Sequence, residues 1–472
     1  MRRLLPIMIL AACLGQTALA VDMETQDPFV QFWNNIIKRP FSDVEPDTTF
    51  NRMLNSVELG AYLRMRYETT NLEFMPRIFG PSPIADPTAV PPIDQFGDKW
   101  REWFAYRAML SAKMDIADDI HVFVEAISMQ AAGNKKLFRY NPGLTVGNRD
   151  PQIRLPIIDL YQGYLLWEDF AVRGFDVQVG RQEIAYSNEW LLGNNDFYGG
   201  LSWDGARVSM KGDQGYFDLF AARLIKRYKP EGPTKPLLFG MYSSYTFVED
   251  SNIDFFALNT QDRMNPNDLG VKADFVGEDR YTLGTRFWGE FYPEVDYSFQ
   301  GAWQFGKTRL PSGRETISAY ALEGELGRTW PEMMWSPRLA VRAARASGDD
   351  SPDSGNATAF NPIYQDFHAR YGYADAVTFS NLIAYSLLGK INMSPGWTVG
   401  GEAHMFRFVD KPAGFSGHHL ANEFDVYVGW EVTEFFNLKF VYANFHKGKA
   451  FRTIDGARDR NHRLFLNIEY AF

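Results

Sequence analysis

Lysine and arginine recur at alternate positions within apolar segments of this 472-residue chain, and fixed cations are the main chemistry that it offers. If each segment is a β-strand, alternation turns these side chains to one face and the apolar residues to the other. Cations on a shared wet face attract carboxylates and repel small cations. The basic residues that alternation places on this face are Arg64, Arg66, Arg107, Lys113, Arg207, Lys211, Arg286, Arg338, Arg342, Lys439 and Arg463.

Acidic residues share the same predicted face in comparable number. They are Glu58, Asp115, Asp176, Asp218, Asp296, Glu323, Glu325, Glu402, Asp425 and Glu469. The mixture allows two interpretations: a path for anions flanked by acids that position the arginines, or a ladder of opposite charges that stiffens the wall. Arg181 stands apart, because the phase of Val177 and Val179 turns it to the apolar face unless a bulge at Gly180 re-aims it.

Catalytic and metal-binding patterns are weak in this sequence. Asp349, Asp350 and Asp353 do not match a calcium-loop pattern and are interpreted as a solvated acidic loop. The adjacent His418 and His419 would point apart in a strand. The remaining histidines on predicted strands or their rims lie in no recognisable motif: His404, His446 and His462. The sequence therefore predicts neither an enzyme nor a cofactor or metal site.

The segment Asn461 to Phe472 shows most clearly which element carries the charges. Leu464, Leu466, Ile468, Tyr470 and Phe472 alternate with polar residues. A strand of an outer-membrane barrel alternates in this way, because one face meets lipid and the other a polar lumen. A half-buried strand in a soluble sheet has the same pattern, so this segment alone does not decide.

The same period of two recurs along the chain and predicts about eighteen strands. They lie near 57–67, 103–116, 120–130, 158–168, 174–181, 203–211, 215–223, 237–247, 253–258, 279–290, 294–306, 315–327, 336–345, 379–391, 397–408, 421–431, 436–446 and 461–472.

The connections between these strands alternate between short turns and long loops. Asp118-Asp119 and Gly212-Asp213-Gln214 are tight turns, whereas 69–102, 131–157 and 346–378 are long. Outer-membrane barrels have short periplasmic turns and long extracellular loops, and a soluble sandwich has no reason to keep such a phase. We predict an all-β transmembrane antiparallel barrel with both ends of the chain in the periplasm, and the three long loops are candidates to fold inward or to cover the pore.

The N-terminus predicts export across the inner membrane. Arg2 and Arg3, an apolar run and Ala18-Leu19-Ala20 form a secretory signal, which gives a signal peptide over 1–20, a periplasmic segment over 21–55 and the barrel over 56–472. Leu10 to Cys13 also fits a lipoprotein cleavage site, so lipidation of Cys13 is an alternative. Cleavage after Ala20 removes the single cysteine, and the mature chain then forms no disulfide.

Composition agrees with a barrel in the membrane. The net charge of −10 argues against nucleic acid as a partner. Mean hydropathy is −0.30, and no uncharged apolar run after the signal approaches the roughly 18 residues of a membrane helix. Lipid-facing residues diluted one to one by polar ones produce such an average.

Several motifs resemble those of the alginate-export outer-membrane family. They are Val179-Gly180-Arg181-Gln182-Glu183-Ile184-Ala185-Tyr186, Trp190-Leu191-Leu192-Gly193, Trp203-Asp204-Gly205-Ala206-Arg207-Val208, and Tyr371-Gly372-Tyr373 leading to Ser380-Asn381-Leu382. The resemblance covers most of 55–472 and does not reach 21–55. It implies an eighteen-stranded monomeric barrel and marks Gly180, Gln182, Asp204 and Gly205 as motif positions.

The resemblance also implies passive export of an anionic polysaccharide, an alginate-like polyuronate, through an electropositive constriction. The basic residues above, with Arg181, are then candidates to line the pore. Gln162 and Glu183 depart from the family, since alginate exporters can carry basic residues there. A general or differently selective porin for small solutes is the alternative. The expected partners are outer-membrane lipid, the polysaccharide, the assembly machinery that would read Phe472, and periplasmic secretion components.

Overall fold

The computed structural model describes residues 56–71, 100–133, 158–225, 236–264, 276–310, 313–350, 355–412, 415–450 and 460–472, without 198, 293 and 367. The predicted signal peptide over 1–20, the alternative lipidation of Cys13 and the predicted periplasmic segment over 21–55 lie outside these residues.

Eighteen antiparallel strands close into a barrel, and one short extra strand, β14, joins it inside a loop. The strands are β1 (Glu58–Thr70), β2 (Arg101–Ala117), β3 (Ile120–Gly133), β4 (Asp159–Trp167), β5 (Phe175–Gln182), β6 (Trp203–Gly212), β7 (Gly215–Leu224), β8 (Leu237–Val248), β9 (Ser251–Met264), β10 (Val276–Tyr292), β11 (Val295–Leu310), β12 (Gly313–Thr329), β13 (Arg338–Ala346), β14 (Asn356–Ala357), β15 (Leu382–Ser394), β16 (Trp397–Phe408), β17 (His419–Thr433), β18 (Phe436–Lys447) and β19 (Arg460–Ala471).

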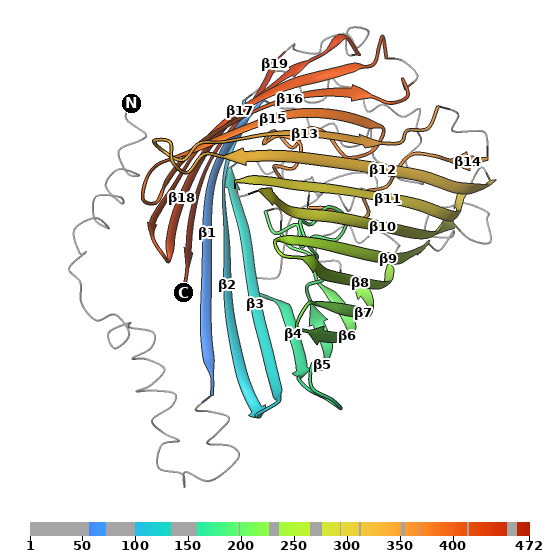
Figure 1. Ribbon diagram of the computed structural model, residues 1–472, viewed down its shortest axis with the longest axis vertical. Helices are drawn as coiled ribbons and strands as arrows, with labels where there is room; N and C mark the ends of the chain where they lie inside the picture. Colours follow the sequence, from blue (N-terminus) through green and yellow to red (C-terminus); the bar gives the residue numbers. More distant parts are fainter. Residues whose placement is uncertain are drawn as a thin grey trace.

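The first and last strands complete the circle. β19 pairs with β18 on one side and with β1 on the other, in a register that sets Met65 opposite Ile468. Phe472 adds two backbone hydrogen bonds to Ala61, each 3.0 Å long. Figure 1 shows the C-terminus beside β1. The prediction of an antiparallel barrel of about eighteen strands is confirmed.

The two largest differences from the predicted strands concern β9 and β14. β9 runs on to Met264, beyond the predicted end at 258, although Asn259, Thr260 and Gln261 are all polar. The backbone ladder with β8 and β10 continues through them, so pairing persists where the apolar alternation has stopped. β14 was not predicted, because two residues that pair in parallel with Thr316 and Ile317 of β12 leave no periodic signal.

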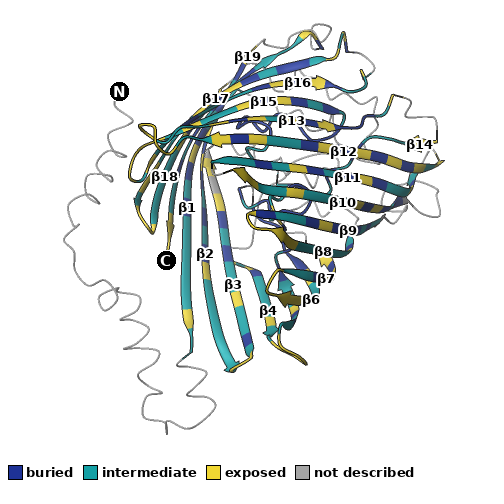
Figure 2. Cartoon of the chain, in the orientation of Figure 1, coloured by how far each residue is buried: buried dark blue, intermediate teal, exposed yellow. Residues whose placement is uncertain are grey.

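Burial alternates along the strands as the sequence predicts. On β12, Tyr320, Leu322 and Leu326 are exposed on the outer face, whereas Ala321 and Glu323 are buried on the inner face. Figure 2 shows the same alternation of exposed and buried residues along β10 to β13. The outer wall is therefore apolar and the inner wall is mixed. In the described part of the chain, no helix is long and apolar enough to cross a membrane.

Two long loops fold into the barrel, where their described residues pack against the inner wall. The β5–β6 loop (183–202) and the β13–β15 loop (347–381) contribute Trp190, Phe360 and Phe379 to one buried apolar cluster. The expectation that 346–378 folds inward agrees with this arrangement. The other two loops expected to do so, 69–102 and 131–157, lie mainly outside the described residues, and inward folding of 183–202 was not predicted.

Candidate functional site: a constriction inside the barrel

The first residues of the β5–β6 loop contact the inner wall formed by β7, β8 and β9, and the loop crosses the lumen from there. The Tyr186 hydroxyl donates to Asp218 Oδ2 at 2.7 Å, and the Ser187 hydroxyl donates to Asp254 Oδ2 at 3.0 Å. The Tyr186 ring stacks on Tyr242 with 4.4 Å between the ring centroids. Buried hydrogen bonds to carboxylates are stronger than neutral ones, so this end of the loop is firmly attached.

The tip of this loop lies against the opposite wall, where guanidinium groups bind its backbone. Arg64 Nη2 and Arg107 Nη1 donate to the Asp196 carbonyl at 2.7 and 2.6 Å. Arg66 Nη1 donates to the Phe197 carbonyl at 3.0 Å. All three arginines lie on β1 and β2, and each is nearly fully buried. Their first role in this structure is to hold the loop tip.

Asp196 also places its carboxylate between two of these arginines. Its Oδ2 lies 3.4 Å from Arg64 Nη1 and 3.4 Å from Arg107 Nη1, and 41% of its side chain is exposed. Charge-assisted N–H···O bonds are shorter, about 2.7–2.9 Å. The two guanidiniums thus face a carboxylate that they do not bind at full strength.

The ring of Phe197 is surrounded by cations. The guanidinium of Arg66 lies 3.8 Å from the ring centroid, and that of Arg463 on β19 lies 5.5 Å from it. The His368 ring from the β13–β15 loop stacks on Phe197 at 3.3 Å between centroids. A guanidinium within about 6 Å of a ring is attracted to its π face, so Phe197 stabilises the positive cluster.

The β13–β15 loop spans the lumen in another direction. Near β11, the Asn361 backbone and the Gln304 amide exchange two hydrogen bonds. At the β12 wall, Arg370 pairs with Glu323 at 2.9 Å. At β19, Asp375 pairs with Arg463 at 2.5 Å. The loop is therefore fixed at separate points around the barrel.

The two loops bind each other where they cross. Tyr364 exchanges backbone hydrogen bonds with Gly193 and Leu191 at 2.8 and 3.1 Å, and the Asp366 amide donates to the Glu189 carbonyl at 3.1 Å. Burial raises the pKa of the Asp366 carboxyl to about 7. Together the loops form one partition across the barrel, which we call the constriction.

Apart from Lys113, the remaining predicted pore residues that face inward are paired with neighbouring groups. Arg207 donates to Gln178 at 2.6 Å, and Arg286 donates to Ser298 at 3.0 Å. Lys113 is partly buried in the register opposite Glu58. The closest contacts of the others are Arg338 to Asp296 at 2.5 Å, Arg342 to Glu325 at 2.7 Å, Lys211 to Asp176 at 2.6 Å and Lys439 to the Tyr373 hydroxyl at 3.0 Å.

Arg181 does not face the lumen. It lies on the outer face with Val179 and forms an ion pair with Asp204 of β6 at 2.8 Å. The register between β5 and β6 runs unbroken through Gly180, so no bulge re-aims the side chain. The expectation that Arg181 lines the pore is therefore wrong, and the outward phase of its neighbours was the better guide.

The motif glycines serve the wall itself. Gly180 and Gly205 lie directly opposite each other on β5 and β6. A Cβ at Gly180, where φ is +133°, would lie 2.4 Å from the Gly163 carbonyl oxygen, and one at Gly205 would lie 2.3 Å from the Ala221 oxygen. Gln182 is buried and donates to the Gly205 carbonyl at 3.3 Å. Close approach of the strands explains why these positions carry no larger side chain.

Comparison with known proteins identifies the family. A sequence model described as alginate export matches residues 103–465, most of the chain. This chain belongs to the alginate export family. No curated protein matches it.

Solved structures similar to this alginate-export family member are outer-membrane proteins. OccK9 (OpdG) of Pseudomonas aeruginosa has a TM-score of 0.57 at 14% identity, covering 89% of this chain and 100% of its own. OccAB2 of Acinetobacter baumannii has 0.56 at 11%, covering 89% and 99%. OccK2 (OpdF) of Pseudomonas aeruginosa, solved in complex with glucuronate, has 0.56 at 10%, covering 89% and 98%. With the family match, these folds identify a channel of the bacterial outer membrane.

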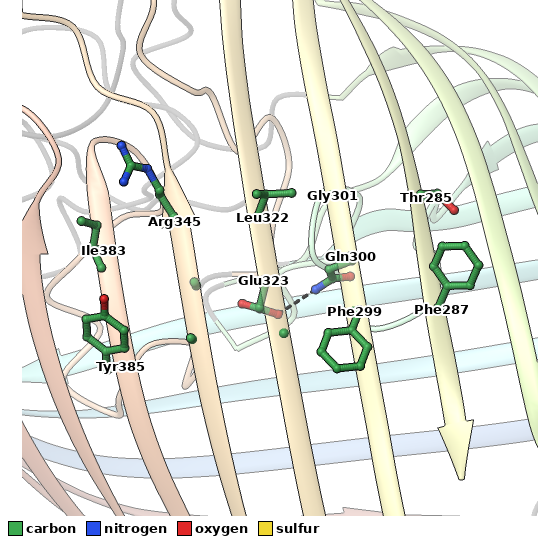
Figure 3. Close-up of a pocket in the computed structure, with 13 residues that line it drawn as sticks. Thr285, Phe287, Phe299, Gln300, Gly301, Leu322, Glu323, Arg345, Ile383 and Tyr385 are labelled. Atoms are coloured by element: carbon green, nitrogen blue, oxygen red, sulfur yellow. Dashed lines mark hydrogen bonds between the residues drawn. The ribbon is translucent and has the colours of Figure 1, made fainter. Parts of the chain in front are cut away.

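The outer wall of the barrel carries a hollow of about 540 Å³. Phe299, Leu322 and Tyr385 border it with exposed side chains, around the small residues Gly301 and Gly324. Figure 3 shows these side chains. Since the exposed side chains that border it belong to the lipid-facing rows, with the inward-facing Gln300 and Glu323 at its floor, this hollow opens on the membrane surface and not on the pore.

Sequence reasoning missed the residues that the loops bring to the constriction. Asp196, Phe197 and Arg370 lie outside the strands, where no alternation indicates direction. The segment carried one usable signal: apolar residues such as Trp190 and Leu191 in a supposedly exposed loop indicate burial.

Proposed function

We propose that this outer-membrane channel conducts an alginate-like polyuronate from the periplasm outward by passive diffusion. The family match supports an exported anionic saccharide. The observation in the lumen that supports it best is the partly exposed carboxylate of Asp196 between Arg64 and Arg107. A polyuronate presents one carboxylate on every sugar. In this proposal Asp196 stands in for the substrate carboxylate, which replaces it when the loop tip moves aside.

The charges around the tip favour this exchange. Four guanidiniums, those of Arg64, Arg66, Arg107 and Arg463, contact the tip or its neighbours. Among the acidic partners that the described residues supply to them, Asp196 is substantially exposed, whereas Glu68 and Asp375 are buried. A displaced Asp196 leaves a positive site open to lumen water, and a new carboxylate gains charge-assisted hydrogen bonds there.

A second candidate is a channel for small carboxylated solutes, such as a single uronate. The two loops that cross the lumen and bury apolar side chains between them favour a narrow passage. OccK2, which shares the fold, was solved in complex with glucuronate. Both candidates require the same arginines, and they differ in whether a polymer can enter.

Planar-bilayer conductance of the purified protein tests the proposal. We expect anion selectivity, block by added polymannuronate, and a half-blocking concentration at least about tenfold higher in the Arg64→Gln/Arg107→Gln double variant, because hydrogen bonds to charged groups contribute about 1.5–3 kcal/mol. Asp196→Asn removes the competing carboxylate and should strengthen the block. Arg181→Gln, an arginine on the outer face, is the matched control and should change nothing.

The outcomes separate the candidates. Block by free mannuronate without block by the polymer would favour the small-solute channel. A channel that is neither anion-selective nor blocked by either compound would exclude both.

A further inference from the structure

The lumen wall carries a histidine between two carboxylates, apart from the arginine cluster. His404 and Glu402 lie on β16 with one residue between them, and Asp425 lies on β17 opposite Glu402 in the register. His404 Nε2 is 3.1 Å from Glu402 Oε2 and 3.5 Å from Asp425 Oδ2. The His404 and Asp425 side chains have no exposed surface, and that of Glu402 is 14% exposed.

The spacing of these atoms fits a shared cation better than a hydrogen bond. A protonated imidazole donates one bond from Nε2, and charge-assisted bonds of this type measure about 2.7–2.9 Å. Both contacts are longer. Ligands at about 2.0–2.2 Å from a tetrahedral Zn²⁺ lie about 3.3–3.6 Å from each other. The three ligand atoms all lie within 4.8 Å of one another, which leaves only a small adjustment to that geometry.

The side chains around His404 carry more negative than positive charge, and a bound cation would compensate this excess. Glu423, the next inward residue of β17, adds a third carboxylate, against the imidazole and the Lys439 ammonium that acts on Glu402. Asp425 Oδ1 and Glu423 Oε2 are buried, and no N–H or hydroxyl donor in the part of the chain that the structure describes binds either oxygen. Buried carboxylate oxygens without partners are costly, and coordination to a metal is one of the few ways to compensate them.

The supporting contacts resemble the outer shell of a metal site. The Ser386 hydroxyl lies 2.7 Å from His404 Nδ1 and fixes the ring so that Nε2 faces the carboxylates. The Tyr373 amide donates to Asp425 Oδ2 at 3.0 Å, and the Ala374 amide donates to Glu423 Oε1 at 2.6 Å. These two amides belong to the β13–β15 loop, so the site adjoins the constriction.

We propose that Glu402, His404 and Asp425 bind one divalent cation of the zinc class, which anchors the β13–β15 loop to the wall. An imidazole nitrogen with two carboxylates suits zinc or a similar first-row ion better than calcium or magnesium, which prefer oxygen ligands only. The bound cation neutralises the carboxylates that accept hydrogen bonds from the Tyr373 and Ala374 amides. It thereby keeps the β13–β15 loop docked on the barrel wall.

A second histidine provides a matched contrast. His121 also lies between two carboxylates, but Asp115 contacts its Nδ1 at 2.5 Å and Glu168 contacts its Nε2 at 3.4 Å. Carboxylates on opposite ring nitrogens cannot share one ion with the imidazole. The same residue types therefore give an ion-pair bridge at His121 and a chelating arrangement at His404.

Calorimetric titration of the chelator-treated full chain with ZnCl₂ tests the site, together with anomalous diffraction at the zinc edge. We expect one Zn²⁺ per chain, an anomalous peak at His404, and at least a 100-fold weaker dissociation constant in His404→Gln. Asp425→Asn should also weaken binding, and His121→Gln should not. Glu402→Gln, the variant at the most exposed of the three side chains, replaces His404→Gln if that protein does not fold.

Three results would overturn the proposal. They are the absence of saturable Zn²⁺ binding, an anomalous peak at another place, and an unchanged dissociation constant in both the Asp425→Asn variant and the folded His404→Gln or Glu402→Gln variant.

Discussion

Arg463 of β19 and Asp375 of the β13–β15 loop form an ion pair with Nη1 and Oδ2 2.5 Å apart and both side chains at most 3% exposed. Arg463 also pairs with Glu68 of β1 at 2.6 Å. One guanidinium thus joins the seam where the barrel closes to the loop that crosses its lumen. The constriction is therefore attached to the seam between β1 and β19, the first and last strands of the barrel.

Removing the carboxylate of this pair should release the loop. Asp375→Asn removes one of the two carboxylates that neutralise the buried Arg463 guanidinium. Breaking a buried ion pair in this way lowers the stability by about 3–5 kcal/mol. We expect single-channel recordings to show larger or noisier conductance. Glu294→Gln is the control, because its pair with Arg328 is 3.9 Å long and at least 31% exposed on both sides, and surface pairs contribute about 0–1 kcal/mol. Equal traces for the two variants would contradict this role of Arg463.

Phe197→Ala should widen the passage. The ring packs between the arginines, His368 and Phe465, and loss of a buried phenylalanine costs about 3–5 kcal/mol. We expect a higher unit conductance. Phe255→Ala, which removes a ring 48% exposed on the outer face of β9, should leave conductance unchanged. A Phe197→Ala channel that conducts like the wild type would show that the loop tip does not narrow the passage.

Docking of the two loops should weaken as the pH rises. Burial raises the pKa of Asp366 from 3.8 to about 7, so the folded state favours the protonated acid. Its stabilising contribution is complete below about pH 4 and is lost as the pH rises through 7. We expect conductance to increase between pH 5 and pH 8.

Asp366→Asn should flatten this pH dependence, because an amide does not titrate. Asp213→Asn, at an exposed turn between β6 and β7, should retain it. A wild-type conductance that is constant from pH 5 to pH 8 would argue against any role of Asp366 in docking.

Gly205→Val should prevent assembly of the wall. Its Cβ would lie 2.3 Å from the Ala221 carbonyl oxygen, a distance that requires the backbones of β6 and β7 to separate. We expect loss of the folded barrel in the outer membrane fraction, measured by its resistance to unfolding in unheated detergent gels. Gly417→Ala is the control, since no atom lies within 4 Å of the added Cβ. Normal assembly of Gly205→Val would disprove the close-approach argument.

Much of the wall could be predicted from the sequence, because lipid on one side and a polar lumen on the other impose a strict period of two. That period placed β19 and the inward Arg64, Arg66 and Arg107 correctly. The end of β9 was predicted too early, because the apolar signal stops at Leu258 while the backbone ladder continues.

The constriction could not be predicted in the same way. Arg64 and Asp196 are 132 positions apart, and their contact depends on how an irregular loop crosses the barrel. Glu402 and His404 share a face by their spacing, but the approach of Asp425 depends on the register between β16 and β17. Local periodicity contains neither piece of information.

The most direct test of the proposed function is the block of single-channel current by polymannuronate, compared between the wild type and the Arg107→Glu/Arg207→Glu variant. Both arginines lie on the inner wall, and reversing their charge should repel the polymer. We expect a concentration-dependent block in the wild type that disappears in the variant. Current that the polymer leaves unchanged in the wild type, or blocks equally in both proteins, would contradict the proposed function.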